Sequence, residues 1–78
     1  MNAVEYIRTR IFQLKQAPFA EVAGVSQPTV SRWEREPGSE PNRDEMERIR
    51  SAAISRRLPW DDSWFFQTFP DDEAETAA

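Results

Sequence analysis

Apolar residues recur at helical spacing near the start of the chain and predict a first helix over residues 3–14. Asn2 and Glu5 have the spacing of a capping box, in which two side chains satisfy the backbone at the start of a helix. An apolar stripe then follows at intervals of three or four residues, at Val4, Ile7, Ile11 and Leu14. We therefore expect this helix to bury one face against the rest of the domain.

The same kind of pattern predicts two further short helices with a tight turn between them. Pro18 suits the first turn of a helix, where its missing N–H costs little, and an apolar face follows over residues 19–23. Gly24 can adopt the left-handed backbone that often ends a helix. Ser26 is a good N-cap, and Pro28 again fits a first turn. These helices are expected over about residues 17–23 and 27–35.

The second half of the chain predicts one longer helix and then a short one. Asn42 precedes Glu45 at capping-box spacing, and the helix that it starts is expected to run until Pro59. A short fifth helix is expected over residues 60–67, and the small, acidic residues 70–78 are expected to be disordered. The predicted fold class is all-α, with four to five short helices. The buried stripe of the fourth helix is expected at Met46, Ile49, Ala53 and Ile54.

Composition excludes several classes of function. The 78 residues suffice for one small domain. Cysteine is absent, which removes disulfides and thiolate metal sites, and histidine is absent, which removes the commonest general base. We find no nucleophile–base pair, no glycine-rich phosphate loop, no membrane span and no signal-peptide core. The expectation is a cytoplasmic protein that is not an enzyme and holds no metal or cofactor.

The charge is unevenly distributed along the chain. The net charge of −4 argues at first against a partner as acidic as DNA. Residues 1–58, however, hold all ten Lys and Arg but only eight Asp and Glu, so this part is about +2. Residues 59–78 hold six acids and no base. Binding depends on the field near the phosphates rather than on the average, so the first 58 residues remain compatible with DNA.

The segment from Gln16 to Glu34 resembles the helix-turn-helix of the phage repressor and Cro group, also called the xenobiotic-response-element type. The similarity rests on the pattern AxxxGVSxxTVSxWE and is reasonable over residues 3–57. It implies a lambda-repressor-like domain over residues 1–58 whose third helix enters the DNA major groove. The matching residues are Gln16, Ala20, Gly24, Val25, Ser26, Gln27, Thr29, Val30, Ser31, Trp33 and Glu34.

The third helix has one apolar and one polar side. A projection at 100° per residue puts Val30 and Trp33 on one side and Arg32 on the other, which is the side expected to face DNA. Arg32 can donate two hydrogen bonds to a guanine, and Gln27 can pair with an adenine edge. The resemblance implies that bases are read from the start of this helix and one turn further on. The candidate base readers are Ser26, Gln27, Pro28, Ser31 and Arg32.

The resemblance also implies residues that hold phosphates and residues that hold the fold. Ala20 allows the helices to cross closely, and Gly24 allows the sharp turn. Glu34 is expected to be structural and to pair with an arginine of the first helix, which we take to be Arg10. The apolar contacts that fix the third helix are expected from Val25, Val30 and Trp33. The candidate phosphate contacts are Lys15, Gln16, Thr29, Arg35 and Arg43.

Residues 59–69 carry an unusual density of aromatic side chains. A monomer rarely exposes an apolar patch of this size, so we expect some of these rings to pack on the core and others to form a homodimer contact. The rings are those of Trp60, Trp64, Phe65, Phe66 and Phe69.

These features predict a transcriptional regulator, specifically a repressor of phage or mobile-element type, that binds double-stranded DNA. One helix reads few base pairs, so a homodimer on a two-fold symmetric operator is expected. One alternative stays open. An antitoxin-like or adaptor protein would grip a partner protein with its C-terminus and bind DNA for autoregulation.

Overall fold

The computed structural model describes residues 1–69, and within this range every regular element is helical. This confirms the predicted all-α fold class. Residues 70–78, for which a disordered acidic tail was expected, lie outside the described residues. The elements are α1 (Ala3–Tyr6), the π-helix η1 (Ile7–Phe12), α2 (Gln16–Ala23), α3 (Gln27–Arg35), α4 (Arg43–Ser55) and the 3-10 helix η2 (Asp62–Phe66).

The first helix differs from the prediction because it widens after one turn. From Ile7 it continues as a π-helix, and Gln13 ends it with a left-handed backbone (φ 55°) whose N–H bonds the carbonyl of Arg8. The expected α-helix to residue 14 is therefore wrong. A π-helix holds more residues per turn than an α-helix, which brings Phe12 onto the buried side. Leu14 lies beyond the helix and is only half-buried.

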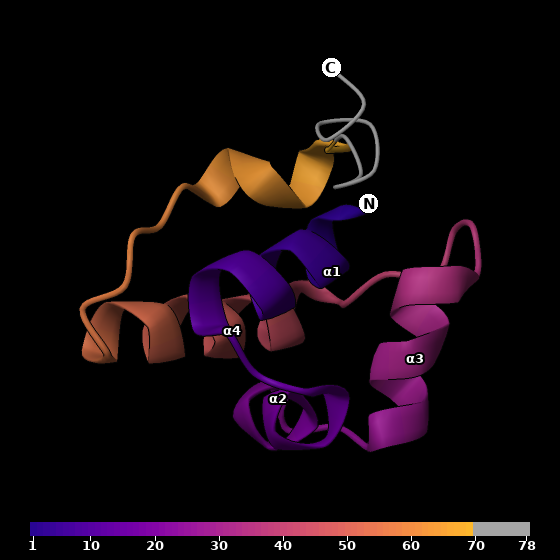
Figure 1. The fold of residues 1–78 in the computed structure, drawn as a ribbon, viewed down its shortest axis with the longest axis horizontal. Helices are drawn as coiled ribbons and strands as arrows, with labels where there is room; N and C mark the ends of the chain where they lie inside the picture. The colour runs from indigo at the N-terminus through magenta and orange to yellow at the C-terminus, as the bar shows by residue number, and fades with distance from the viewer. Residues whose placement is uncertain (70–78) are drawn as a thin grey trace.

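The predicted N-caps of α1, α3 and α4 are confirmed, and of the two predicted capping boxes the structure shows the one that starts α4. Asn2, Ser26 and Asn42 each accept a hydrogen bond from the backbone three residues on, and Asn42 completes a capping box with Glu45. Gly24 ends α2 in the left-handed conformation (φ 75°). The chain therefore turns sharply between α2 and α3, and α3 stands crosswise to α2 at one side of the molecule (Figure 1).

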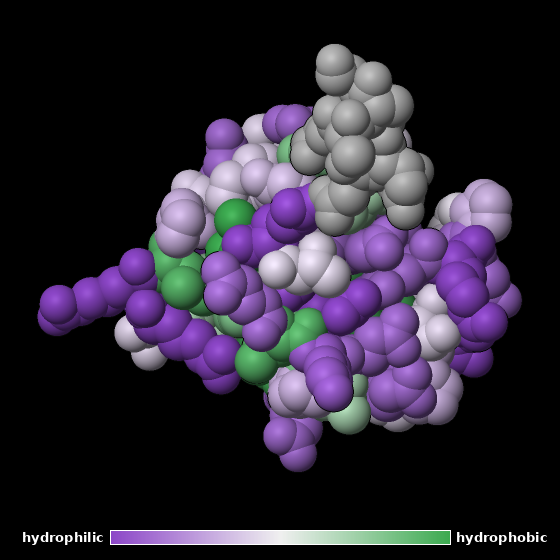
Figure 2. Space-filling view, in the orientation of Figure 1, coloured by the Kyte–Doolittle hydropathy of each residue, from purple (hydrophilic) through white to green (hydrophobic). Residues whose placement is uncertain are grey.

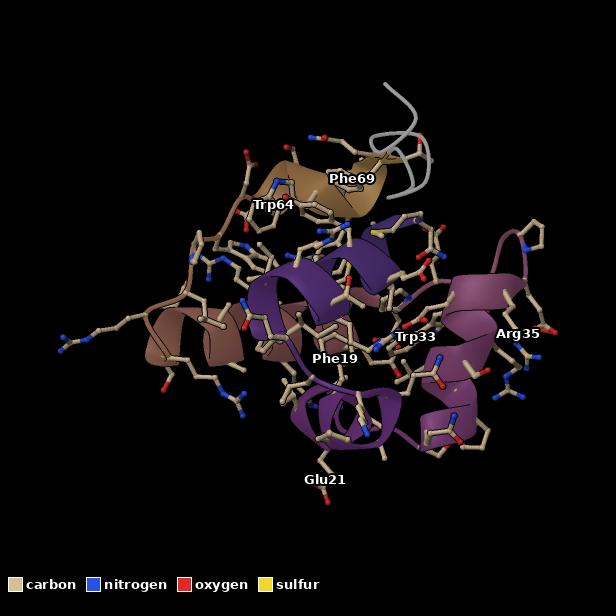
Figure 3. The ribbon with its side chains drawn as sticks, in the orientation of Figure 1. Phe19, Glu21, Trp33, Arg35, Trp64 and Phe69 are labelled. Atoms are coloured by element: carbon tan, nitrogen blue, oxygen red, sulfur yellow. The ribbon has the colours of Figure 1, made fainter. Side chains whose placement is uncertain are left out.

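The core lies where α1, η1, α2, α3 and α4 meet. Phe19 is completely buried between the helices, and its ring meets the edge of Phe12 with centroids 5.4 Å apart (Figure 3). Ile49 and Ala53 are the buried residues of α4, whereas Ile54 is exposed, contrary to expectation. Ile54 directly follows Ala53, so the helix turns it about 100° away from the buried side.

The aromatic segment after α4 folds back over α1 (Figure 1). The fourth helix ends at Ser55 rather than at Pro59, and the fifth is a short 3-10 helix rather than the expected 60–67. The aromatic segment contacts Tyr6 of α1. The Tyr6 ring stacks on Phe69 with centroids 3.9 Å apart and packs edge-on against Trp64 with centroids 5.7 Å apart. Trp60, Trp64 and Phe65 are thereby packed against the core.

The surface in the view of Figure 2 is mostly hydrophilic, including the side formed by α3, and hydrophobic residues show only as small patches. Among residues 1–69, no helix combines the length and the apolar composition that crossing a membrane requires.

Candidate nucleic-acid interface

Helix α3 is anchored along one face and open along the other. Val30 and Trp33 are buried, and Trp33 points into the body of the molecule while Arg35 points away from it (Figure 3). Gln27, Pro28 and Arg32 are exposed, and Ser31 is half-buried at the margin. The apolar contacts therefore fix the helix without covering the polar residues at its start, where recognition helices contact base edges.

Hydroxyl groups in the first turn of α3 hold Arg32. The Ser26 and Thr29 hydroxyls lie 2.9 Å apart, and Nη2 of Arg32 donates to Oγ1 of Thr29 at 3.3 Å. This bond lays the guanidinium back along the helix, toward its N-terminal end. Ser26, Thr29 and Arg32 are thus brought together on one side of α3, within its first two turns.

Glu34 pairs with Arg8 and not with Arg10, which corrects the expectation. Nε and Nη2 of Arg8 donate to the two carboxylate oxygens of Glu34 at 2.6 and 3.0 Å. The side chains of Arg8 and Glu34 are only 14% and 6% exposed. Hydrogen bonding to Glu34 raises the pKa of Arg8 above its ordinary value. The resemblance implied an arginine of the first helix without deciding which one, and both Arg8 and Arg10 lie in the π-helix; the contact between distant elements is what identifies Arg8.

Two glutamine amides extend this ion pair to the surface. Nε2 of Gln16, the first residue of α2, donates to Oε1 of Glu34 at 3.1 Å. Nε2 of Gln27, the first residue of α3, donates to Oε1 of Gln16 at 2.6 Å. Both glutamines were candidate DNA contacts from the sequence, but their mutual contact and the link to Glu34 were not foreseen. We call this chain of four side chains from Arg8 to Gln27 the amide relay.

The remaining candidate phosphate contacts, Lys15, Arg35 and Arg43, lie at the ends of three different helices. Within residues 1–69 no side chain caps the N-terminus of α2, where Lys15 stands exposed. Backbone N–H groups at such an end attract anions. Arg35 donates to the Ser31 carbonyl at 3.5 Å and is exposed on α3. Arg43 is the exposed first residue of α4 and is separated from α3 by the loop of residues 36–42.

Two supporting residues were missed in the sequence. Nδ2 of Asn2 donates to the Trp33 carbonyl at 2.6 Å, which ties the end of α3 to the start of α1. Arg48 reaches the carbonyl of Ala23 at 3.5 Å and lies over Gly24 in the turn. The exposed, charged character of Arg48 favoured a solvated position, and only the tertiary structure shows that it covers the turn.

Comparison with known proteins identifies the same region. A family model described as helix-turn-helix matches residues 8–52, which is more than half of the chain and spans α2, α3 and most of α4. No curated protein and no solved structure shows a significant match to the chain.

Proposed function

Because this chain belongs to the helix-turn-helix family of the Cro/C1 type, and is therefore a DNA-binding transcription regulator, we propose that it is a repressor with α3 in the major groove of a specific operator. The family is one of DNA-binding domains and not of enzymes. One observation carries the proposal: Val30 and Trp33 anchor α3, while the polar side chains at its start stay exposed.

The first turn of α3 supplies the proposed base contacts. The exposed Gln27 amide can pair with an adenine edge, and Arg32 can donate two hydrogen bonds to guanine. The bond from Arg32 to Thr29 supports this role, because it reduces the freedom that the guanidinium loses on binding. Ser26 and Ser31 offer hydroxyls along the same face, and the Pro28 ring is an apolar surface suited to a thymine methyl.

Positive and N–H donor groups around α3 supply the proposed phosphate contacts. Lys15 and Gln16 lie at the uncapped start of α2, and Thr29 and Arg35 lie on α3. Arg43 begins α4 on the far side of the loop. Contacts of this kind fix the register of a protein on DNA but carry no sequence information.

The operator is proposed to be two-fold symmetric and bound by a homodimer, because one helix reads only a few base pairs. Phe66 supports this step, since its side chain is 82% exposed while the neighbouring rings pack on the core. It borders a groove of about 410 Å³ that includes Val4, Trp33 and Met46. A second copy related by a two-fold axis would place each Phe66 against the other copy's groove. The groove is also the feature that favours the alternative, an adaptor that grips a partner protein.

Selection of bound sites from random DNA tests the function directly. We expect a two-fold symmetric consensus, and recovery of unrelated sequences alone would contradict the proposal. Arg32→Ala should lower the ratio of operator to random-DNA affinity by about 10- to 100-fold. Arg57→Ala removes the same charge from an exposed arginine beyond the C-terminal end of α4, and it serves as the control.

Sedimentation of Phe66→Ser tests the dimer. The variant should keep the wild-type unfolding free energy but lose cooperative binding to the two half-sites. Unchanged self-association would remove Phe66 from the interface. A wild-type monomer that instead co-sediments with a neighbour-encoded protein would favour the adaptor alternative.

A further inference from the structure

We propose that Glu34 determines which edge of the Gln27 amide faces DNA, and that it does so through Gln16. The inference rests on the proposed function of Gln27 as a base reader. Glu34 is buried and does not reach the surface of α3, so its role is that of a positioning residue. The physical basis is the direction of the hydrogen bonds in the amide relay.

The relay starts from a group whose bonding direction is fixed. Arg8 donates to both oxygens of Glu34, so the carboxylate is held in one orientation. An ionised carboxylate can only accept hydrogen bonds. A third N–H of Arg8 donates to the carbonyl of Leu14 at 3.0 Å, which holds the guanidinium in place as well. The direction of the hydrogen bonds between Arg8 and Glu34 therefore cannot be reversed, because a guanidinium only donates and a carboxylate only accepts.

The fixed acceptor orients both amides in turn. An amide has a donor NH2 and an acceptor oxygen of nearly equal size, and it can flip between them. The Gln16 atom 3.1 Å from Glu34 must be the nitrogen, because the carboxylate has no proton to give. The Gln16 oxygen therefore faces Gln27 and must accept, so the Gln27 atom 2.6 Å away must be its nitrogen. Each orientation follows from the one before it.

This polarity leaves Gln27 with one N–H and its Oε1 for DNA. Adenine presents an acceptor, N7, beside a donor, the N6 amino group, and matches that pair. Reversal of the relay would leave both N–H groups of Gln27 facing outward. Guanine presents two acceptors, N7 and O6, and would match the reversed amide. Glu34 thus favours adenine over guanine at the base pair that Gln27 reads.

Affinities for operators with each of the four base pairs at every position test this inference. Gln27→Ala should remove the preference at one position, which identifies the base pair. At that position, Gln16→Met and Glu34→Gln should each lower the adenine-over-guanine preference by about 5- to 10-fold, since one side of a two-bond match is worth about that much. Preferences at the other positions should not change. Gln13→Met, at an exposed glutamine between η1 and α2 that makes none of the relay bonds, is the matched control.

The design separates the relay from the proposed function and from stability. If Gln27→Ala alters no position, then Gln27 is not a base reader and the proposed function of this residue fails. If Gln27→Ala alters one position but Gln16→Met leaves its adenine-over-guanine ratio unchanged, the relay is overturned. Gln16→Met keeps the Arg8–Glu34 pair, so an unchanged ratio in this variant overturns the relay even if Glu34→Gln does not fold. A uniform loss of affinity with unchanged ratios would also overturn the relay, because it indicates a phosphate contact.

A measurement on the free protein gives a second readout. The side-chain NH2 signals of Gln27 in a nitrogen-15 correlation spectrum should differ from those of a free glutamine. They should move toward the free values in both Gln16→Met and Glu34→Gln. Gln27 signals that stay unchanged in Gln16→Met would contradict the relay independently of DNA binding.

Discussion

The turn between α2 and α3 offers a sharp test of how the interface is held, because Gly24 is constrained twice. Its φ of 75° lies in the left-handed region, and a Cβ added there would lie 2.8 Å from Nη1 and 3.3 Å from Cδ of Arg48. Gly38 has a similar φ of 84° but no atom within 4 Å of such a Cβ. Gly24→Ala should therefore destabilise the protein more than Gly38→Ala does.

The magnitude follows from separate contributions. A left-handed backbone costs an L-residue roughly 1–2 kcal/mol, and the lower entropy of unfolded Ala offsets about 0.4–1 kcal/mol, which leaves about 1 kcal/mol at either glycine. At Gly24, Arg48 must also move. It would lose its long bond to the Ala23 carbonyl and its contact with the turn, for about 1 kcal/mol more. We expect destabilisation of about 2 kcal/mol for Gly24→Ala and about 1 kcal/mol for Gly38→Ala.

Urea unfolding at 25 °C, with one m-value shared by all variants, measures the two changes. The excess cost of Gly24→Ala over Gly38→Ala should disappear when both are placed on an Arg48→Ala background. Equal costs for the two glycines in the native background would refute the contact argument. An excess that persists without Arg48 would assign it to the turn backbone instead.

Three further predictions concern ion pairing, aromatic packing and pH. Arg8→Met leaves the carboxylate of Glu34 buried without its cationic partner, and it should lower the free energy of unfolding in urea by about 3 kcal/mol. The matched control is Arg50→Met in the exposed pair with Asp62, which should cost at most about 0.5 kcal/mol. Equal costs for the two variants would contradict the burial of the Arg8–Glu34 pair. Trp64→Ala removes the edge-on ring contacts with Tyr6 and Trp60, so it should destabilise the protein by about 2 kcal/mol and lower the midpoint of thermal unfolding. An unchanged midpoint would show that the aromatic segment does not pack on α1. Hydrogen bonds from Ser63 lower the pKa of Asp61 in the folded protein below its ordinary value of 3.8. The ionised Asp61 therefore stabilises the folded state above pH 3.8, and this contribution is lost as the pH falls through the lowered pKa. Asp61→Asn should therefore flatten the fall of the urea midpoint below pH 4, and parallel curves would refute it.

Local signals in the sequence were sufficient for the starts of α3 and α4 and for the end of α2. Ser26 and Asn42 cap α3 and α4 because their side chains bond backbone only three residues away, which requires no knowledge of the fold. Gly24 was predicted at a positive φ for the same reason. These local rules fixed the position of α3, and the family match over residues 8–52 agrees with them.

Contacts between distant elements were not predictable in the same way. The pairing of Glu34 with Arg8 joins residues 26 positions apart, and the π-helix that holds Arg8 was not expected, because the sequence pattern of apolar residues favoured an ordinary α-helix. Phe12 was assigned no role for the same reason, although it is buried. The aromatic segment packs against Tyr6, which lies more than fifty residues earlier in the chain, and no local pattern indicates this contact.

The amide relay shows how such a missed contact bears on function. Gln16 and Gln27 begin two different helices, and only the turn at Gly24 brings them within hydrogen-bond distance. The buried pair of Arg8 and Glu34 then serves the fold and the proposed reading of bases together. A substitution at Glu34 would therefore change stability and base preference at once, whereas a substitution at Gln16 would change base preference while leaving the ion pair intact. This difference is what allows the two roles of Glu34 to be separated by experiment.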